Sequence, residues 1–101
     1  MGNKVKFIER PETKYLVFKC PGCGYEHVFV ISSTEYTDVW RWNGSLVKPT
    51  LAPSLLNTIP NKNKVCHLFV EDGQIRYMAD CTHELAGKTV DMEDINECVF
   101  K

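Results

Sequence analysis

Residues 66–81 read CHLFVEDGQIRYMADC, in which two mainly apolar runs flank Asp72-Gly73. An Asp-Gly pair between apolar runs is a strong hairpin signal, because both residues tolerate the positive φ angles of a tight turn. The stretch therefore predicts a β-hairpin with strands over His67–Val70 and Ile75–Ala79.

The register of this hairpin places its polar residues. A two-residue turn pairs Val70 with Ile75, and side chains alternate between the two faces of a strand. Cys66 and Cys81 then lie on one face as diagonal neighbours. His67 and Asp80 point to the opposite face, while His83 lies two residues past Cys81 and can turn toward the cysteines.

A second motif, CPGCG at residues 20–24, stands between the apolar runs YLVFK (15–19) and HVFVI (27–31). The pattern predicts two strands joined by a zinc-knuckle turn, in which both thiolates point at one centre. A redox CxxC pair would instead open a helix. Five cysteines, an odd number, also fit poorly with a closed set of disulfides.

The remaining segments are short and punctuated by turn residues. Trp40 and Trp42 share a strand face and are interpreted as core, with a ligand-stacking platform as the alternative. The stretch KPTLAPSLL (48–56) is expected at an edge or in a loop, because Pro49 and Pro53 donate no ladder hydrogen bond. Asp91 can cap a short helix over residues 92–97.

These signals predict a mostly β fold with one or two short helices, resembling a small zinc knuckle or zinc ribbon. At 101 residues the chain has the size of one domain, and no linker divides it, so residues 1–101 are expected to form a single zinc-binding domain. The oligomeric state cannot be inferred from these patterns.

Charge and hydropathy narrow the function classes. Twelve basic and thirteen acidic residues give a net charge of −1, which disfavours nucleic acid as a partner. The first residues contain no apolar run of the length expected for a signal peptide, and no apolar stretch has the length expected of a membrane-spanning helix. We expect a cytoplasmic protein, in the host cytoplasm if it is encoded by a phage, whose partner or substrate is a protein.

The cysteine and histidine pattern predicts one metal site. The favoured set is tetrahedral Zn²⁺ on Cys20, Cys23, Cys66 and Cys81, the closed coordination of a structural site. Replacement of one cysteine by His67 or His83 is the competing interpretation. Cys98 has no partner cluster and is expected to be buried without a function.

Three ligand-type residues, His67, Asp80 and His83, then remain beside the metal. They are candidate catalytic residues that bind or activate a water molecule. Ordinary structural roles, such as a hydrogen-bonded histidine or a turn carboxylate, are the alternative. Ser54 could act as a nucleophile, but after Pro53 it is interpreted as a helix cap or turn residue.

The order of motifs resembles a family of short phage and bacterial proteins of unknown function that carries the label ammonia-monooxygenase-like. The matching stretches are CPGCG (20–24), WRWNG (40–44), KPTLAPSLL (48–56, with its PTxxPS core), CHLFVEDGQIRYMADCTHELAG (66–87) and TVDM (89–92). Nothing in these residues supports monooxygenase chemistry. Similar proteins accompany ubiquitin-like conjugation genes in bacteria, and this resemblance implies a peptidase role.

Two functions follow as hypotheses. The first is a zinc-dependent hydrolase, a peptidase or isopeptidase acting on ubiquitin-like conjugates. The second is a non-catalytic zinc-knuckle module that binds a host or viral protein.

Overall fold

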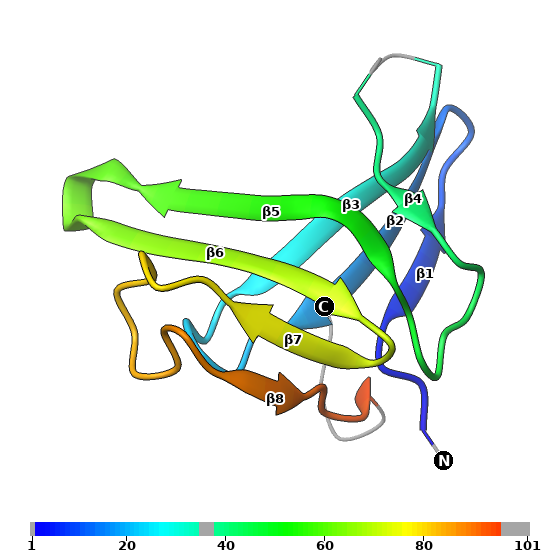
Figure 1. Ribbon diagram of the computed structural model, residues 1–101. Coiled ribbons are helices and arrows are strands. Elements are labelled where there is room, and N and C mark those ends of the chain that lie inside the picture. Colours follow the sequence, from blue (N-terminus) through cyan, green and yellow to red (C-terminus); the bar gives the residue numbers. More distant parts are fainter. Residues whose placement is uncertain (1, 35–37, 96–101) are drawn as a thin grey trace.

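The computed structural model describes residues 2–34 and 38–95, which form two antiparallel sheets (Figure 1). Within these residues a three-stranded sheet has the order β1-β2-β3 and a five-stranded sheet has the order β4-β5-β6-β7-β8. The first sheet contains β1 (Lys6–Glu9), β2 (Thr13–Lys19) and β3 (Glu26–Ser33). The second contains β4 (Arg41–Trp42), β5 (Leu51–Ile59), β6 (Lys64–Glu71), β7 (Gln74–Tyr77) and β8 (Thr89–Asp91), with a 3-10 turn η1 (Pro60–Lys62) between β5 and β6.

The hydrophobic core lies between the two sheets. In Figure 1, β2 and β3 pass behind β5 and β6. Leu16, Phe18 and Phe29 of the first sheet belong to the same buried cluster as Leu68 and Ile75 of the second. The mostly β prediction is confirmed, and the inward-facing residues alternate with outward-facing ones as a two-layer packing requires.

The predicted hairpin is present as β6 and β7. Val70 pairs with Ile75, as the Asp-Gly turn predicts, and Asp72 and Gly73 have φ angles of 50° and 77°. The ladder ends at Tyr77. Beyond that point the chain follows β6 through single hydrogen bonds, such as that from the Thr82 amide to the Val65 carbonyl at 3.0 Å.

The prediction for residues 48–56 is wrong in part, because most of this stretch belongs to β5, which has β4 on one side and β6 on the other. The β5–β6 register shifts between Leu51 and Leu55, which pair with Val70 and Leu68. Pro53 lies inside this irregularity, after a cis peptide bond to Ala52. A proline in a bulge removes no regular ladder bond, so the strand can continue through it.

The predicted C-terminal helix is also corrected as far as residue 94. Asp91 ends strand β8, and residues 92–94 are not helical. The Met92 amide instead donates to the Gly73 carbonyl at 3.0 Å, and Met92 is buried in the core. Residues 96–101, including Cys98, lie outside the described residues.

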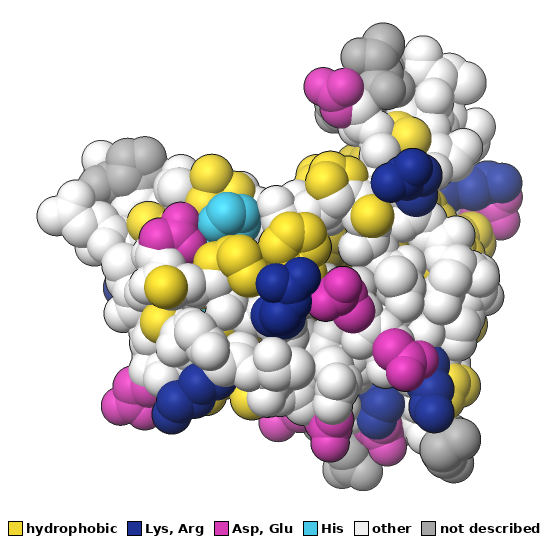
Figure 2. All heavy atoms as spheres, viewed as in Figure 1, with side chains coloured by type: hydrophobic (Ala, Val, Ile, Leu, Met, Phe, Trp, Pro, Cys, Tyr) yellow, Lys and Arg dark blue, Asp and Glu magenta, His cyan; other side chains and the backbone are white. Residues whose placement is uncertain are grey.

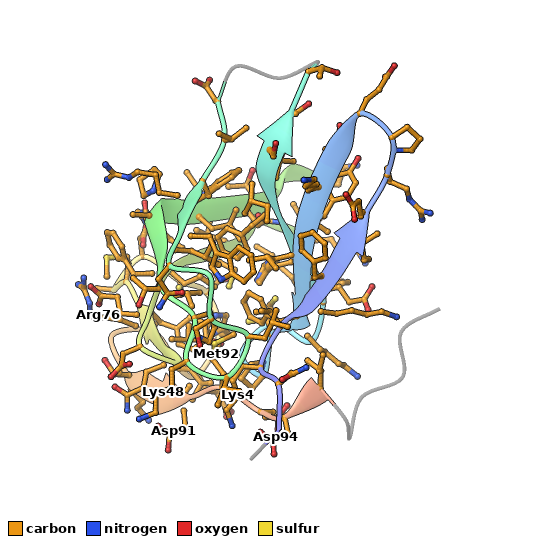
Figure 3. All side chains as sticks on the ribbon, turned by 90° about the vertical axis from the view of Figure 1, so that its right-hand side faces the viewer. Lys4, Lys48, Arg76, Asp91, Met92 and Asp94 are labelled. Atoms are coloured by element: carbon orange, nitrogen blue, oxygen red, sulfur yellow. The ribbon has the colours of Figure 1, made fainter. Side chains whose placement is uncertain are left out.

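The N-terminal segment is attached to this region of the molecule. Lys4 and Asp94 form an ion pair, and both side chains lie at the lower edge of the view in Figure 3. The Ile95 amide donates to the Asn3 carbonyl at 2.8 Å. Within the described residues, no helix is long and apolar enough to cross a membrane.

The two tryptophans contribute to packing, in agreement with their interpretation as core residues. Trp40 contacts Phe29 edge to face at a centroid distance of 5.3 Å, and Trp42 stacks on Phe7 at 6.2 Å. Trp40 also donates from Nε1 to the carbonyl oxygen of Ser54 at 3.4 Å. Through this bond the segment before β4 contacts the irregular part of β5.

Candidate functional site

A serine, a histidine and a carboxylate lie in a row on the outer face of the five-stranded sheet. Ser54 Oγ is 3.2 Å from His67 Nε2, and His67 Nδ1 is 3.2 Å from each carboxylate oxygen of Asp80. When Nδ1 carries the ring proton and donates it to Asp80, Nε2 is free to accept from the Ser54 hydroxyl. This is the hydrogen-bond order of a serine nucleophile, its base and the group that orients the base.

The alternation of β6 and the bulge of β5 bring these residues together. Leu68 and Leu55 are paired core residues, so their neighbours His67 and Ser54 point outward. Between Leu51 and Leu55 the chain advances four residues while the paired part of β6 advances two, from Val70 to Leu68. The extra residues include Ser54, so the nucleophile candidate lies where the regular ladder is interrupted.

Solvent can reach this row. The side chains of His67 and Asp80 are 27% and 58% exposed. Figure 2 shows a histidine next to an acidic side chain above β5 and β6, with hydrophobic side chains around them and a hollow in the surface beside them. Leu56, which pairs with His67, is 56% exposed. The row is therefore open to solvent, and Ser54 is itself only partly buried.

A second cluster lies on the inner side of the sheet. Cys20, Cys23 and His27 come from the turn and strand after β2, and Cys66 comes from β6. The sulfurs of Cys20 and Cys66 are 3.8 Å apart, and Cys23 Sγ is 3.5 Å from His27 Nε2. One ligand atom from each of the four residues lies within 4.8 Å of the others.

These four residues fit a tetrahedral metal ion. Ligand bonds of about 2.3 Å to sulfur in a tetrahedron separate two sulfurs by about 3.8 Å, the separation seen between Cys20 and Cys66. Thiolates with one imidazole form a closed set that is typical of structural zinc. The buried His27 Nδ1 has no hydrogen-bond partner in the structure, so this ring lacks the outer partner that usually fixes a ligand histidine.

Without a metal ion, the electrostatics of the cluster favour the thiolate form of Cys20 over those of Cys23 and Cys66. The hydrogen bond from Cys66, with help from His27 and Tyr77, lowers the pKa of Cys20 to about 3 against the effect of burial. The same contact and burial raise the pKa of Cys66, and burial raises the pKa of Cys23. The Tyr77 hydroxyl lies 3.0 Å from Cys20 Sγ and can donate to it. Metal binding at this cluster would therefore release protons from the other thiols.

His83 and Cys81 form a second group with Cys66. Their ligand atoms also lie within 4.8 Å of one another, and His83 Nε2 is 3.4 Å from Cys66 Sγ. The Leu85 amide donates to His83 Nδ1 at 3.2 Å, so a neutral His83 ring carries its proton on Nε2. That proton can stabilise a Cys66 thiolate. The arrangement favours His27 over His83 as the nitrogen ligand of the first group.

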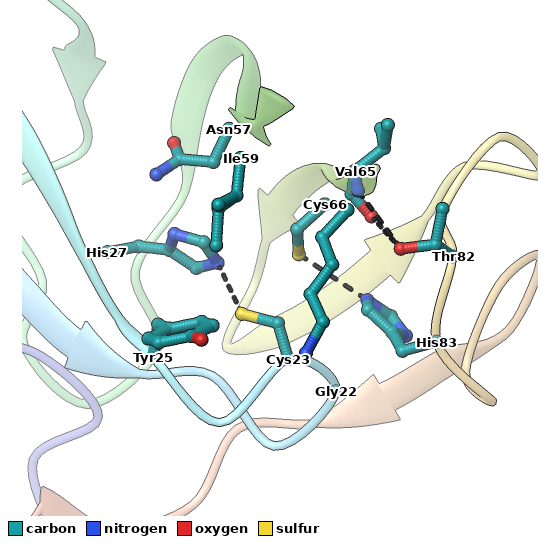
Figure 4. Close-up of a pocket in the computed structure, with 11 residues that line it drawn as sticks. Gly22, Cys23, Tyr25, His27, Asn57, Ile59, Val65, Cys66, Thr82 and His83 are labelled. Carbon is teal, nitrogen blue, oxygen red and sulfur yellow. Dashed lines mark hydrogen bonds between the residues drawn. The ribbon is translucent and has the colours of Figure 1, made fainter. Parts of the chain in front are cut away.

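Part of the cluster lines a cavity of about 350 Å³ near the turn that joins β5 and β6. Cys23, His27, Cys66 and His83 contribute to its wall, together with Asn57 of β5 (Figure 4). Gly22 also lines the cavity and lies against the His83 ring, where an added Cβ would be 2.5 Å from the ring. The knuckle glycine therefore allows the close approach of His83.

The predicted site residues thus divide into two sites. Cys20, Cys23 and Cys66 meet as the sequence indicates, whereas Cys81 joins only the second group, with Cys66 and His83. His67 and Asp80 contact each other and Ser54, and neither belongs to a metal-binding group among the described residues. The interpretation of Ser54 as a helix cap or turn residue is wrong, because Ser54 is inside β5.

Sequence reasoning missed His27 as a ligand candidate. The signal was present, because CPGCGYEH places a histidine four residues after the second cysteine, at a common zinc-ligand spacing. Pairing with Phe18 on β2 turns His27 toward the core, where it is 1% exposed. Only the strand register shows that this ring faces the cysteines.

The chain matches a known protein family. Residues 2–78 match the family described as bacterial ubiquitination-like system serine protease, BubE. The matched span includes Ser54 and His67, as well as Cys20, Cys23, His27 and Cys66, and it ends two residues before Asp80. Comparison with curated proteins and with solved structures gave no match. Because the match covers most of the chain, this protein belongs to the BubE family.

Proposed function

We propose that this protein is a serine peptidase that cleaves the bond between a ubiquitin-like protein and the group attached to its C-terminus. Ser54 is the nucleophile, His67 is the general base and Asp80 orients His67. The observation that carries the proposal is the pair of 3.2 Å contacts that His67 makes, with Ser54 on one ring nitrogen and Asp80 on the other. The family description supports both the serine chemistry and the substrate class.

The chain's own residues can carry out both halves of such a reaction. Ser54 Oγ attacks the carbonyl carbon of the scissile amide or ester while His67 Nε2 takes the hydroxyl proton. The tetrahedral intermediate collapses, the amine or alcohol leaves with that proton, and the acyl group stays on Ser54. Water then attacks the acyl-serine with His67 as base, which releases the carboxylic acid and restores the serine.

The metal cluster has a different role in this proposal. We assign Zn²⁺ to Cys20, Cys23, Cys66 and His27, a closed set that binds the two sheets together and leaves catalysis to Ser54. This replaces the zinc-activated water of the first sequence hypothesis. The change rests on the position of His67 and Asp80, which face the serine on the opposite side of the sheet from Cys66.

The test compares Ser54→Ala with the unchanged protein on a ubiquitin-like protein fused through its C-terminus to a reporter. Loss of one triad member should reduce turnover by at least about 1000-fold, and a fluorophosphonate probe should label the unchanged protein but not the variant. Ser32→Ala, a substitution of an exposed serine on β3, is the matched control and should retain activity and labelling.

Two outcomes would contradict the proposal. Cleavage that persists in Ser54→Ala but stops with a chelator would favour metal-activated water. Absence of both cleavage and labelling in well-folded, zinc-loaded protein would favour the non-catalytic binding module.

A further inference from the structure

The thiol of Cys81 contacts the backbone of His67. Cys81 Sγ lies 3.2 Å from the His67 amide nitrogen and 3.2 Å from the His67 carbonyl oxygen. The amide donates to the sulfur, and the thiol donates to the carbonyl. The Cys81 side chain thus supplies hydrogen-bond partners for the amide and the carbonyl of His67, which a neighbouring strand would otherwise supply.

This contact lies where the β6–β7 ladder stops. Regular pairing ends with Leu68 opposite Tyr77, so His67 is the first residue of β6 beyond it on that side. The Met78 amide also donates to the His67 carbonyl at 2.8 Å. Val65, two residues earlier, is held by Thr82 through its amide and carbonyl groups. Residues 78–82 thus hold β6 by separate contacts rather than by a regular ladder.

We propose that Cys81 is a positioning residue of the serine site and not a metal ligand, an inference that rests on the proposed function. Its thiol fixes the His67 backbone, and its neighbour Asp80 holds the His67 ring. One short segment therefore sets both the location and the orientation of the base. A metal-bound thiolate carries no proton and cannot donate to the His67 carbonyl, so the two roles exclude each other.

The geometry of the first cluster agrees with this assignment. Cys20, Cys23, Cys66 and His27 supply four ligands without Cys81. Cys66 precedes His67 in β6, so the cluster holds the strand one residue before the histidine, and the Cys81 thiol holds the backbone of the histidine itself. The serine site and the cluster share a strand but no side chain.

The experiment compares Cys81→Ser and Cys81→Ala, with Cys66→Ser as the ligand control. Serine keeps a donor and an acceptor at this position, whereas alanine removes both. Zinc content should remain at the level of the unchanged protein in both Cys81 variants and fall in Cys66→Ser. Turnover should fall by about 10- to 100-fold in Cys81→Ala with KM changed less than about threefold, since small displacements of a catalytic group have effects of this size. Cys81→Ser should recover most of that loss.

A second readout does not depend on hydrolysis. The Nδ1 proton of His67 is expected to give a low-field NMR signal because it is hydrogen-bonded to Asp80. That signal should persist in Cys81→Ser and disappear in Cys81→Ala at equal zinc content. Loss of zinc in both Cys81 variants would show that Cys81 is a ligand and overturn the inference. An unchanged His67 signal in a zinc-loaded Cys81→Ala protein would overturn it as well. If Ser54→Ala retained cleavage, the proposed function would fail separately, while zinc content and the His67 signal would still report on Cys81.

Discussion

Asp80 directs both carboxylate oxygens at one ring nitrogen of His67 although its side chain is 58% exposed. Water and salt screen an exposed pair, so the bond contributes little to the stability of the fold. Its value lies in orientation, because an acceptor at Nδ1 holds the ring proton there and leaves Nε2 unprotonated. Only that tautomer can accept the proton of Ser54.

Asp80→Asn should therefore separate activity from stability. An asparagine amide can donate to Nδ1, which favours the tautomer with the proton on Nε2 and blocks transfer from Ser54. Turnover is expected to fall by at least about 100-fold, with an unchanged melting temperature and zinc content. Asp38→Asn, at another exposed acid, is the control and should retain full turnover. A fully active Asp80→Asn protein would show that Asp80 does not orient the base.

At the scale of single residues, the sequence predicts which face of a strand a side chain points to better than it predicts which residue that side chain contacts. The alternation of β6 correctly separates His67 from Cys66, because that inference needs only period two and a known turn. The contact between Ser54 and His67 depends on the shift in the β5–β6 register, and a serine after a proline resembles a turn residue. Where an irregular strand brings a serine to a histidine, as it does here, no local sequence pattern predicts the contact.

Among the elements, the β6–β7 hairpin has the most direct effect on the site, because β6 carries both Cys66 and His67. Its turn requires positive φ angles at Asp72 and Gly73. The turn also packs closely, since an added Cβ on Gly73 would lie 3.3 Å from the Lys48 Cα. The Gly73 amide donates to the Pro49 carbonyl at 2.9 Å, which connects the turn to the segment before β5.

Gly73→Ala is expected to destabilise the protein more than Gly87→Ala. Both glycines have positive φ, 77° and 75°, so both substitutions introduce backbone strain of about 1 kcal/mol. Only Gly73 adds a close backbone contact, because Gly87 faces open space. Urea unfolding of both variants measures the difference in the free energy of unfolding. Equal decreases in the free energy of unfolding would show that the close contact with Lys48 does not destabilise the Gly73→Ala variant.

The sequence predicts this hairpin well and β5 poorly. Asp-Gly between apolar runs has few alternative structures, so the turn and its register follow from local rules. For residues 48–56 the rule that excludes proline from central strands holds only for regular pairing. Pro53 lies where β5 and β6 are out of register, and that irregularity depends on long-range packing that the sequence does not display.

At the scale of the whole molecule, the candidate metal cluster connects the two sheets. Cys20, Cys23 and His27 belong to the three-stranded sheet and its turn, and Cys66 belongs to the five-stranded sheet. The sheets also meet through the apolar core and through the contacts of the Tyr77 hydroxyl with Cys20 and Gly22. In a chain of 101 residues a single core gives limited stability. A bound ion that favours only the folded ligand set adds its binding free energy to folding.

Removal of the metal should therefore lower the free energy of unfolding by at least about 3 kcal/mol, since a structural zinc contributes several kcal/mol or more. Urea unfolding with and without a chelator measures this, together with metal analysis that should give about one zinc per chain.

Cys20→Ser and Cys23→Ser should prevent soluble folding or reproduce the metal-free protein. Cys98→Ser should cost only about 1 kcal/mol, the typical effect of a point substitution. Because Cys66 and His67 are adjacent on β6, metal-free protein should also react more slowly with a fluorophosphonate at Ser54, even at temperatures where it stays folded. An unchanged unfolding curve after complete metal removal would show that the core alone holds the two sheets together, and the cluster would then lose its structural role.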